Sequence, residues 1–221
     1  MNNEVSIDIK MAHAEMISYL VEKREYSSFL EIGVWGGRTN PPHNRIVCKN
    51  KIGVDPDTNF GSMERVIPWT SDQYFDFLYR YTNNVEFDII FIDGLHTEEQ
   101  VDKDIENSLN FLSEGGLIML HDCSPPTEWH ARPLEEFGGT GQWNGTAYRS
   151  VVKLRCMDEN MKILTVDDDW GCSIIDPSGT QKTFSDIPLD EILGDFSVFD
   201  KNRKEILNLI SVDEFLEIFK S

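Results

Sequence analysis

The chain of 221 residues has little positive charge for its size. Twenty lysines and arginines stand against 39 aspartates and glutamates, which gives a formal net charge of −19 at pH 7. Proteins that bind nucleic acid need clustered Lys and Arg to replace counterions, so we expect no nucleic-acid partner. The acidic balance fits a small-molecule substrate or simply an acidic surface.

Cysteines and long apolar runs are also scarce. The four cysteines form no C-x-x-C pair and no metal-finger spacing, so we expect reduced, mostly packed thiols. There is no stretch of 18 or more apolar residues, and the N-terminus has no charged segment followed by an apolar one. We therefore expect no membrane partner and a cytoplasmic location. Without repeats or a long linker, residues 1–221 are predicted to form one domain, with a helix in 1–28, a core in 29–176 and a helical extension in 177–221.

Two short segments carry most of the information that is present. Residues 29–37 read FLEIGVWGG, and residues 51–57 read KIGVDPD. Each is a brief apolar run ending in a turn, which is typical of a buried parallel strand. Asp55 follows Gly33 by 22 residues (55 − 33), where nucleotide-binding α/β folds place an acid that binds ribose hydroxyls. The pair predicts a site for an adenosine-bearing cofactor.

The residues around the glycines favour one cofactor over another. A dinucleotide fingerprint, G-x-G-x-x-G, sets a pyrophosphate on a helix N-terminus. Here the glycines are Gly33, Gly36 and Gly37, and Glu31 precedes them. A carboxylate is a poor neighbour for pyrophosphate and a good one for an ammonium group. S-adenosylmethionine carries an amine, a sulfonium and a ribose but no phosphate, so the electrostatics favour it over NAD.

Periodicity along the chain predicts alternating strands and helices. We expect a helix over residues 9–21, a short helix starting at Pro41 with Thr39 or Asn40 as its cap, and helices starting at Thr70 and Thr97 with Thr-x-x-Gln capping boxes. The first capped helix should bury residues 75, 78 and 79, and Gly115-Gly116 should end the second. Further segments are strands at 87–94, 117–120 and 161–166, a helix at 147–157, and helices within 189–219.

The last predicted strand changes direction. Residues 167–171 form a turn that leads into an apolar run at 172–176, which predicts a hairpin rather than another crossover. The fold class is therefore predicted to be α/β, a Rossmann-like doubly wound, mostly parallel sheet with a terminal antiparallel hairpin strand and helices on both faces. The three aspartates at 167–169 lack the spaced ligands of a calcium loop and indicate a solvated turn.

These segments together resemble class I S-adenosylmethionine-dependent methyltransferases, and within them the small-molecule O-methyltransferase-like branch. The resemblance runs from about residue 29 to 176 and rests on EIGV at 31–34, KIGVDP at 51–56, FIDGLH at 91–96, the glycines at 115–116 and HD at 121–122. The terminal hairpin agrees, because such methyltransferases end their sheet with an antiparallel strand.

The resemblance implies a set of cofactor-binding residues. Glu31 is expected to hold the amine of the donor, directly or through water. Asp55 is expected to bind the two ribose hydroxyls, and Asp72, with Ser71 beside it, the adenine amine. Asp93 is expected where the sulfonium meets the acceptor. The full set is Glu31, Gly33, Trp35, Gly36, Asp55, Ser71, Asp72 and Asp93.

The candidate catalytic residues are His96, His121 and Asp122. Methyl transfer to a hydroxyl needs alignment of the reacting atoms and a base for the proton. The two histidines follow adjacent predicted strands, so both are expected to face one cleft. The alternative role for each is to cap a loop or the start of a helix. Asp93, His121 and Asp122 are alternatively a divalent-metal set, although a histidine is less typical of Mg²⁺. His13, on an apolar helix face, is expected to be a packing residue.

A long segment over residues 124–145 is expected to be an irregular loop. It contains Trp129, His130, Arg132, Trp143 and Asn144, and it is either a lid that binds the acceptor or a disordered segment. The favoured function is methyl transfer to a hydroxyl of a small-molecule acceptor, and a sugar or saccharide-linked metabolite is one candidate for that acceptor. The protein is compatible with a homo-oligomer. The alternatives are an NAD-dependent oxidoreductase or epimerase and a non-catalytic nucleotide-binding module.

Overall fold

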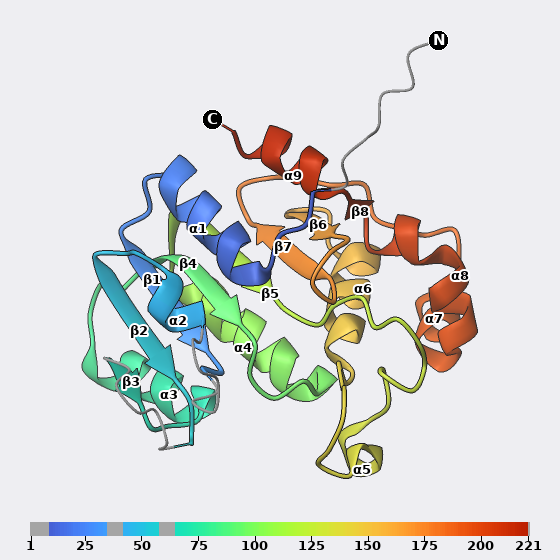
Figure 1. Ribbon diagram of the computed structural model, residues 1–221, viewed down its shortest axis with the longest axis horizontal. Coiled ribbons are helices and arrows are strands. Elements are labelled where there is room, and N and C mark those ends of the chain that lie inside the picture. The colour runs from blue at the N-terminus through green and yellow to red at the C-terminus, as the bar shows by residue number, and fades with distance from the viewer. Residues whose placement is uncertain (1–8, 35–41, 58–64, 221) are drawn as a thin grey trace.

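The computed structural model describes residues 9–34, 42–57 and 65–220. The strands of this part form one sheet in the order β3-β2-β1-β4-β5-β7-β6-β8 (Figure 1). All neighbours are parallel except that β7 runs antiparallel to both β5 and β6, so the predicted fold class is confirmed. The strands are β1 Ser28–Ile32, β2 Asn50–Val54, β3 Val66–Ile67, β4 Phe87–Ile92, β5 Leu112–Leu120, β6 Lys162–Val166, β7 Cys172–Asp176 and β8 Leu209–Ile210.

Helices cover both faces of this sheet, and each face has its own apolar core. Along β1, Leu30 and Ile32 enter one core with α3, α4, α6 and α8, whereas Phe29 enters the other with α1 and α9. This alternation follows from the two-residue period of a strand. The helices are α1 His13–Lys23, α2 Pro42–Arg45, α3 Ser71–Tyr81, α4 Glu98–Asn110, α5 Leu134–Phe137, α6 Ala147–Met157, α7 Leu189–Gly194, α8 Phe196–Ile206 and α9 Val212–Ile218.

The two predicted capping boxes form to different extents. At α3 the Thr70 hydroxyl accepts from the Gln73 N–H, and the Gln73 side chain accepts from the Thr70 N–H. At α4 the Thr97 hydroxyl accepts from the Gln100 N–H, but the Gln100 side chain turns to α3 instead. The second box is therefore only half formed, and its glutamine is available for another role.

Two local predictions are wrong. The glycines at 115 and 116 lie inside β5, where its register with β4 shifts, and not at a helix end. A Cβ at Gly116 would lie 2.9 Å from the carbonyl oxygen of Asp88, so close strand approach explains this glycine. On α3, Tyr79 is 53% exposed, and Tyr74 takes the buried place beside Phe75.

The C-terminal segment, residues 189–218, adds a strand to the sheet and packs helices against it. The short strand β8 pairs in parallel with β6, which the sequence did not predict because two residues carry no periodicity. Phe199, Ile206, Leu207 and Phe215 of this segment are fully buried.

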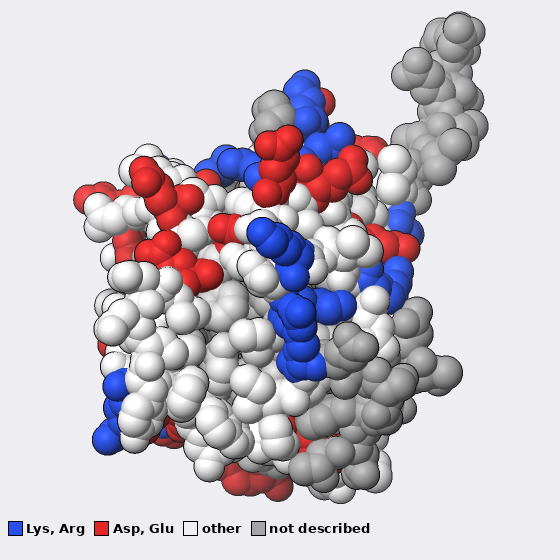
Figure 2. Space-filling model, turned by 90° about the vertical axis from the view of Figure 1, so that its left-hand side faces the viewer, with Lys and Arg blue, Asp and Glu red and all other residues white. Residues whose placement is uncertain are grey.

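No helix among the described residues is long and apolar enough to cross a membrane. On the face shown in Figure 2, acidic side chains gather in the upper part, and much of the remaining surface is uncharged.

Candidate functional site

A cavity of about 770 Å³ lies at the carboxyl ends of the parallel strands. Open α/β sheets bind ligands at this edge, and the volume is within the range of about 300–1,000 Å³ that small-molecule pockets have. The wall is built by residues that follow β1, β2, β4 and β5, by the first turn of α3, and by the segment before α6. Its residues are Ile32, Gly33, Val54, Asp55, Pro56, Thr70, Ser71, Asp93, Gly94, Leu95, His96, Gln100, His121, Asp122, Gly141, Gln142, Trp143, Asn144 and Trp170.

The ends of β1 and β2 contribute a glycine and an acid to this wall. Gly33 has a φ of +87°, and a Cβ there would lie 2.1 Å from the carbonyl oxygen of Asp93, so no larger residue fits. Asp55 directly follows β2, is buried, and accepts a hydrogen bond of 2.8 Å from the Asp57 N–H. The structure thus brings these two predicted residues to one cavity.

Glu31 points elsewhere. Its carboxylate lies 3.1 Å from the His43 Nδ1 of α2, both side chains are fully buried, and Glu31 is not among the residues that line the cavity. Burial raises the pKa of this carboxyl, although the hydrogen bond from His43 opposes the shift. Trp35 and Gly36, and the expected cap at Thr39 or Asn40 with Pro41, lie outside the described residues.

A polar cluster closes the cavity at α3. The Gln100 amide donates to the Ser71 hydroxyl at 3.2 Å, to the Asp72 carboxylate at 3.0 Å and to the Asp104 carboxylate at 3.1 Å. Ser71 and Gln100 line the cavity, whereas Asp72 is exposed in the first turn of α3. Burial raises the pKa of Asp104 to about 6. Sequence reasoning missed Gln100 because it assigned this residue to the capping box.

The residues that follow β4 and β5 form an alternating set of carboxylates and imidazoles in the cavity wall. The Asp93 Oδ1 lies 3.2 Å from the His96 Nε2 and 3.1 Å from the His121 Nδ1. The His96 Nδ1 lies 3.1 Å from the Asp122 Oδ2, and the Asn144 amide donates to the other Asp122 oxygen. Asp122 has a φ of +59°, a strained backbone conformation for this residue type. The structure therefore brings all three predicted catalytic residues together with Asp93.

These contacts shift the ionisation of the cluster. For Asp93, burial favours the neutral acid, but the charges and hydrogen bonds of His121 and His96 prevail and hold its pKa well below the usual range. For His96, burial is outweighed by the hydrogen bond to Asp93 and the charge of Asp122, so its pKa is raised. The pKa of His121 is raised well above its ordinary value, against burial, by Asp93, Asp122 and Asp169.

The cluster has the spacing of a metal site, but its carboxylate oxygens already have other partners. Ligand atoms of Asp93, His96 and Asp122 lie within 4.8 Å of one another. Mg²⁺ prefers carboxylates and water, and here the two carboxylates already face the ring nitrogens of two histidines and the amide of Asn144. As arranged, this set does not fit a hard divalent cation, and we derive no step through one.

The segment 124–145 is folded over the cavity mouth. The Trp143 ring stacks on His96 with 5.6 Å between centroids and on Phe137 with 4.5 Å. The Trp143 indole N–H donates to the Arg132 carbonyl at 2.7 Å. Trp143 and Asn144 line the cavity, while Trp129, His130 and Arg132 pack outside its wall.

The turn after β6 differs from its prediction. Instead of being solvated, Asp168 accepts from the Met11 N–H at 2.8 Å, and Asp169 accepts from the His13 N–H at 2.7 Å. Trp170 lines the cavity. Sequence reasoning missed these roles, although the predicted hairpin contained a signal for them. Because β7 is antiparallel to both β5 and β6, β6 runs in the same direction as β4 and β5, and its carboxyl end lies at the same edge of the sheet.

Comparison with known proteins agrees with this architecture. Residues 30–123 match the model of a family described as a methyltransferase domain. No curated protein sequence shows a detectable match to the chain.

Solved structures with the same fold include two O-methyltransferase-type proteins. The O-methyltransferase from Bacillus cereus in complex with S-adenosylhomocysteine is 14% identical, with a TM-score of 0.52, 77% of this chain covered and 83% of that one. A candidate caffeoyl-CoA O-methyltransferase from Staphylococcus aureus is 16% identical, with a TM-score of 0.55 and coverages of 79% and 86%. The chain thus has a segment, residues 30–123, that matches a methyltransferase-domain family, and over about four fifths of its length it shares the fold of these O-methyltransferase structures.

Proposed function

We propose that the chain transfers a methyl group from S-adenosylmethionine to a hydroxyl of a small, uncharged acceptor. The observation that carries the proposal is one cavity whose wall holds Gly33 and Asp55, which follow β1 and β2, together with Asp93, His96, His121 and Asp122, which follow β4 and β5. S-adenosylmethionine supplies an activated methyl group on a sulfonium, and the structures of B. cereus and other neighbours hold its product or the cofactor itself.

The described wall suits that cofactor chemically. Asp55, buried at the end of β2, is placed to accept hydrogen bonds from ribose hydroxyls. Ser71 and Gln100, which are hydrogen-bonded to each other, are polar groups of this wall that the adenine would meet. The carboxylates of Asp93 and Asp122 favour a cationic sulfonium. Carboxylates are poor neighbours for a pyrophosphate, which disfavours the NAD alternative.

Glu31 enters this proposal only indirectly. Its carboxylate is held by His43 rather than by the cavity wall, so any contact with the amine of the donor would need an intervening water. We therefore assign Asp55, and not Glu31, as the principal charged contact to the cofactor.

The acceptor is proposed to lie beside Trp143 and Trp170. These indoles line the cavity with Gln142 and Asn144, and this part of the wall offers apolar surface and side-chain polar atoms to a polyhydroxylated ligand. An acceptor with phosphates or carboxylates would find no Lys or Arg on the described wall. A sugar or saccharide-linked metabolite fits this chemistry better than an anionic thioester.

His96 is proposed as the base. Its Nε2 is held by Asp93, and its Nδ1 has no aligned hydrogen-bond partner among the described residues although Asp122 lies nearby. Trp143 stacks on the ring and limits its rotation. As the acceptor oxygen bonds to the methyl carbon, the carbon–sulfur bond breaks, and the His96 Nδ1 takes the hydroxyl proton.

Calorimetric titration with S-adenosylmethionine, S-adenosylhomocysteine and NAD tests the cofactor assignment. We expect binding of the first two, and a loss of about tenfold to a hundredfold for Asp55→Asn, because a charged hydrogen bond contributes about 1.5–3 kcal/mol. Asp57→Asn, two residues further along and exposed, is the matched control and should bind like the wild type. Binding of NAD alone would refute the proposal.

A panel of neutral sugars, phenols and anionic thioesters, assayed with radiolabelled cofactor, tests the acceptor class. Methyl transfer to neutral hydroxyl compounds is the expected result. Transfer confined to phosphorylated acceptors would refute the acceptor assignment and leave the cofactor assignment standing.

A further inference from the structure

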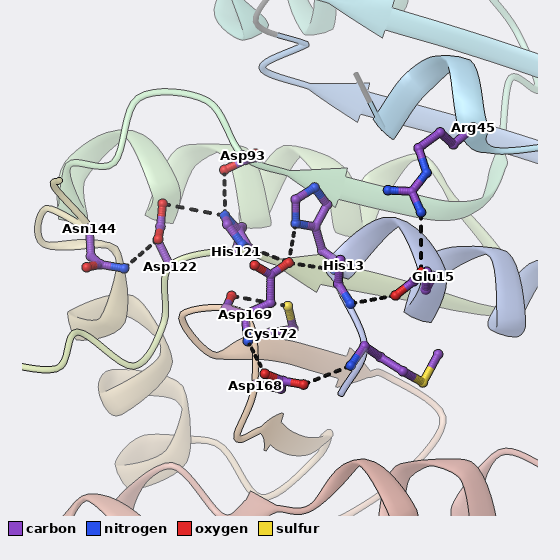
Figure 3. Close-up of polar contacts among 12 residues, drawn as sticks. His13, Glu15, Arg45, Asp93, His121, Asp122, Asn144, Asp168, Asp169 and Cys172 are labelled. Atoms are coloured by element: carbon purple, nitrogen blue, oxygen red, sulfur yellow. Dashed lines mark hydrogen bonds and ion pairs between the residues drawn. The ribbon is translucent and has the colours of Figure 1, made fainter. Parts of the chain in front are cut away.

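The carboxylate of Asp169 lies on the far side of His121 from the cavity. It accepts two hydrogen bonds from His13, one from the backbone N–H at 2.7 Å and one from the ring Nδ1 at 2.6 Å. The same oxygen lies 3.6 Å from the His121 Nε2. Figure 3 shows this carboxylate between the two imidazole rings, whose centroids are 4.4 Å apart.

An unusual turn backbone places this carboxylate. Asp169 and Trp170 have φ values of +46° and +67°, a conformation that residues with side chains rarely adopt. The turn is tied to the strained end of β5, because the Cys123 N–H donates to the Gly171 carbonyl at 2.9 Å and the Ser124 N–H to the Trp170 carbonyl at 2.8 Å. This geometry sends the Trp170 side chain to the cavity and the Asp169 carboxylate to His121. Such strain is typical of functional positions.

His121 consequently has a carboxylate at each ring nitrogen. Its Nδ1 lies at hydrogen-bond distance, 3.1 Å, from Asp93, whereas its buried Nε2 has no hydrogen-bond partner among the described residues and lies 3.6 Å from the Asp169 carboxylate, as an ion-pair contact. Two fixed partners on opposite sides of a ring determine its rotation. Since Asp93 Oδ1 also contacts His96, the orientation of His121 bears on the proposed base.

We propose that Asp169, supported by His13, is a positioning residue for methyl transfer: it fixes the His121 ring, which in turn holds Asp93 in place for His96. This proposal rests on the proposed function. The order of contacts is Asp169 to His121, His121 to Asp93, and Asp93 to His96. Neither Asp169 nor His13 lines the cavity, so both act through His121 and not on the ligand.

The groups that face His121 come from five elements or turns. They are Asp93 and His96 after β4, Asp122 and the thiol of Cys123 after β5, Asp169 before β7, His13 of α1 and the thiol of Cys172 on β7. Although burial opposes it, the nearby His121 ring and the hydrogen bonds from His13 keep the pKa of Asp169 well below its usual range. The negative charge is therefore present at neutral pH and available to His121.

The turn itself offers a matched pair of variants. Asp169→Asn keeps an oxygen for the His13 N–H and tolerates a positive φ, but removes the charge beside His121. Asp168→Asn changes the neighbouring residue, which accepts from the Met11 N–H and has no contact with His121 among the described interactions. Each variant changes one anchor of the segment that leads into α1: Asp168 holds the Met11 N–H, and Asp169 holds the His13 N–H and ring.

We expect Asp169→Asn to lower kcat by about tenfold to a hundredfold with little change in KM for the cofactor, and Asp168→Asn to keep the wild-type kcat. Imidazole NMR with ¹⁵N labelling, assigned with His121→Gln, follows the same contact without turnover. The titration midpoint of His121 should fall by about 1–3 pH units in Asp169→Asn, since an opposite charge is removed, and should stay unchanged in Asp168→Asn. His13→Gln should give a smaller fall.

Three outcomes overturn the proposal. One is an equal loss of kcat in Asp168→Asn and Asp169→Asn, which would mean that the turn acts only by anchoring α1. A second is an unchanged titration of His121 in Asp169→Asn. The third is stoichiometric Zn²⁺ binding by the wild type that Asp169→Asn abolishes, since His13, His121 and Asp169 would then be a metal set. If the wild type transfers no methyl group but the NMR difference is present, the contact stands and only the proposed function fails.

Discussion

At the scale of single residues, the carboxylate oxygen Oδ1 of Asp93 organises the site. It faces one nitrogen of His96 and one of His121, so each ring depends on the position of the other. The sequence placed Asp93, His96 and His121 at neighbouring strand ends, which is why they were predicted to meet. It could not show that they share one oxygen, because that depends on side-chain rotation within the folded cavity.

The protonation of His96 is expected to control the rate. A base acts only when it is unprotonated, and the pKa of His96 is raised above its ordinary value. The kcat should therefore fall as the pH decreases through a midpoint above about 6.5. His96→Gln should lower kcat by about 10²–10⁴-fold and remove this acidic limb.

His130→Gln is the control for that measurement. His130 lies outside the cavity wall and contacts Thr127 and Gln142. Its variant should keep the wild-type pH–rate profile. A His96→Gln enzyme with an unchanged profile would exclude this histidine as the base.

At the scale of elements, strand ends and turns determine where the functional groups lie. The turn before β7 carries Asp169 and Trp170 to the same edge of the sheet as the residues after β4 and β5. The hairpin itself was predicted from its turn and apolar run. Its contacts with α1 were not, because residues 13 and 169 are 156 positions apart and only the folded chain joins them.

Helix α8 is expected to contribute strongly to stability. Phe199 is fully buried and lies 4.5 Å from the Tyr148 ring of α6, between ring centroids. Phe199→Ala should lower the free energy of unfolding by about 3–5 kcal/mol, through lost burial and the cavity that remains. Urea unfolding followed by circular dichroism measures this change.

Tyr81→Ala is the corresponding surface substitution. Tyr81 ends α3 and is 73% exposed, so its variant should lie within about 0.5 kcal/mol of the wild type. Equal unfolding midpoints for the two variants would show that α8 is not part of the cooperative core.

At the scale of the whole molecule, the buried histidines and aspartates link stability to pH. Burial opposes the native charges, but the surrounding contacts lower the pKa values of Asp93 and Asp169 and raise those of His96 and His121. The lowered acids contribute stability above their unfolded pKa near 3.9, which is lost as the pH falls. The raised histidines contribute stability below about 6.5, which is lost as the pH rises through their native pKa values.

The melting temperature should therefore be highest between about pH 4 and 6.5 and decrease on either side. Asp169→Asn should reduce the decrease on the alkaline side, since the pKa of His121 is then less raised. The variant changes only one unit of a net charge of −19, so general charge repulsion is nearly the same in both proteins. Scanning calorimetry across pH 3–9 measures the two curves, and parallel curves would contradict the linkage.

The sequence by itself determined the fold class and the edge of the sheet at which the site lies. Strand-like runs, the Thr70 capping box and the hairpin are local patterns, and local patterns depend on residues close together in the chain. Gly33, Asp55 and Asp93 were placed correctly at the cavity because each directly follows a strand.

Only the tertiary structure decided which side chains pair across the molecule. It directed Glu31 to His43, turned Gln100 from its capping box to α3, and set Asp169 between His13 and His121. These outcomes depend on distances between residues far apart in the chain and on the competition for partners in a buried space. No period or spacing in the sequence encodes that competition.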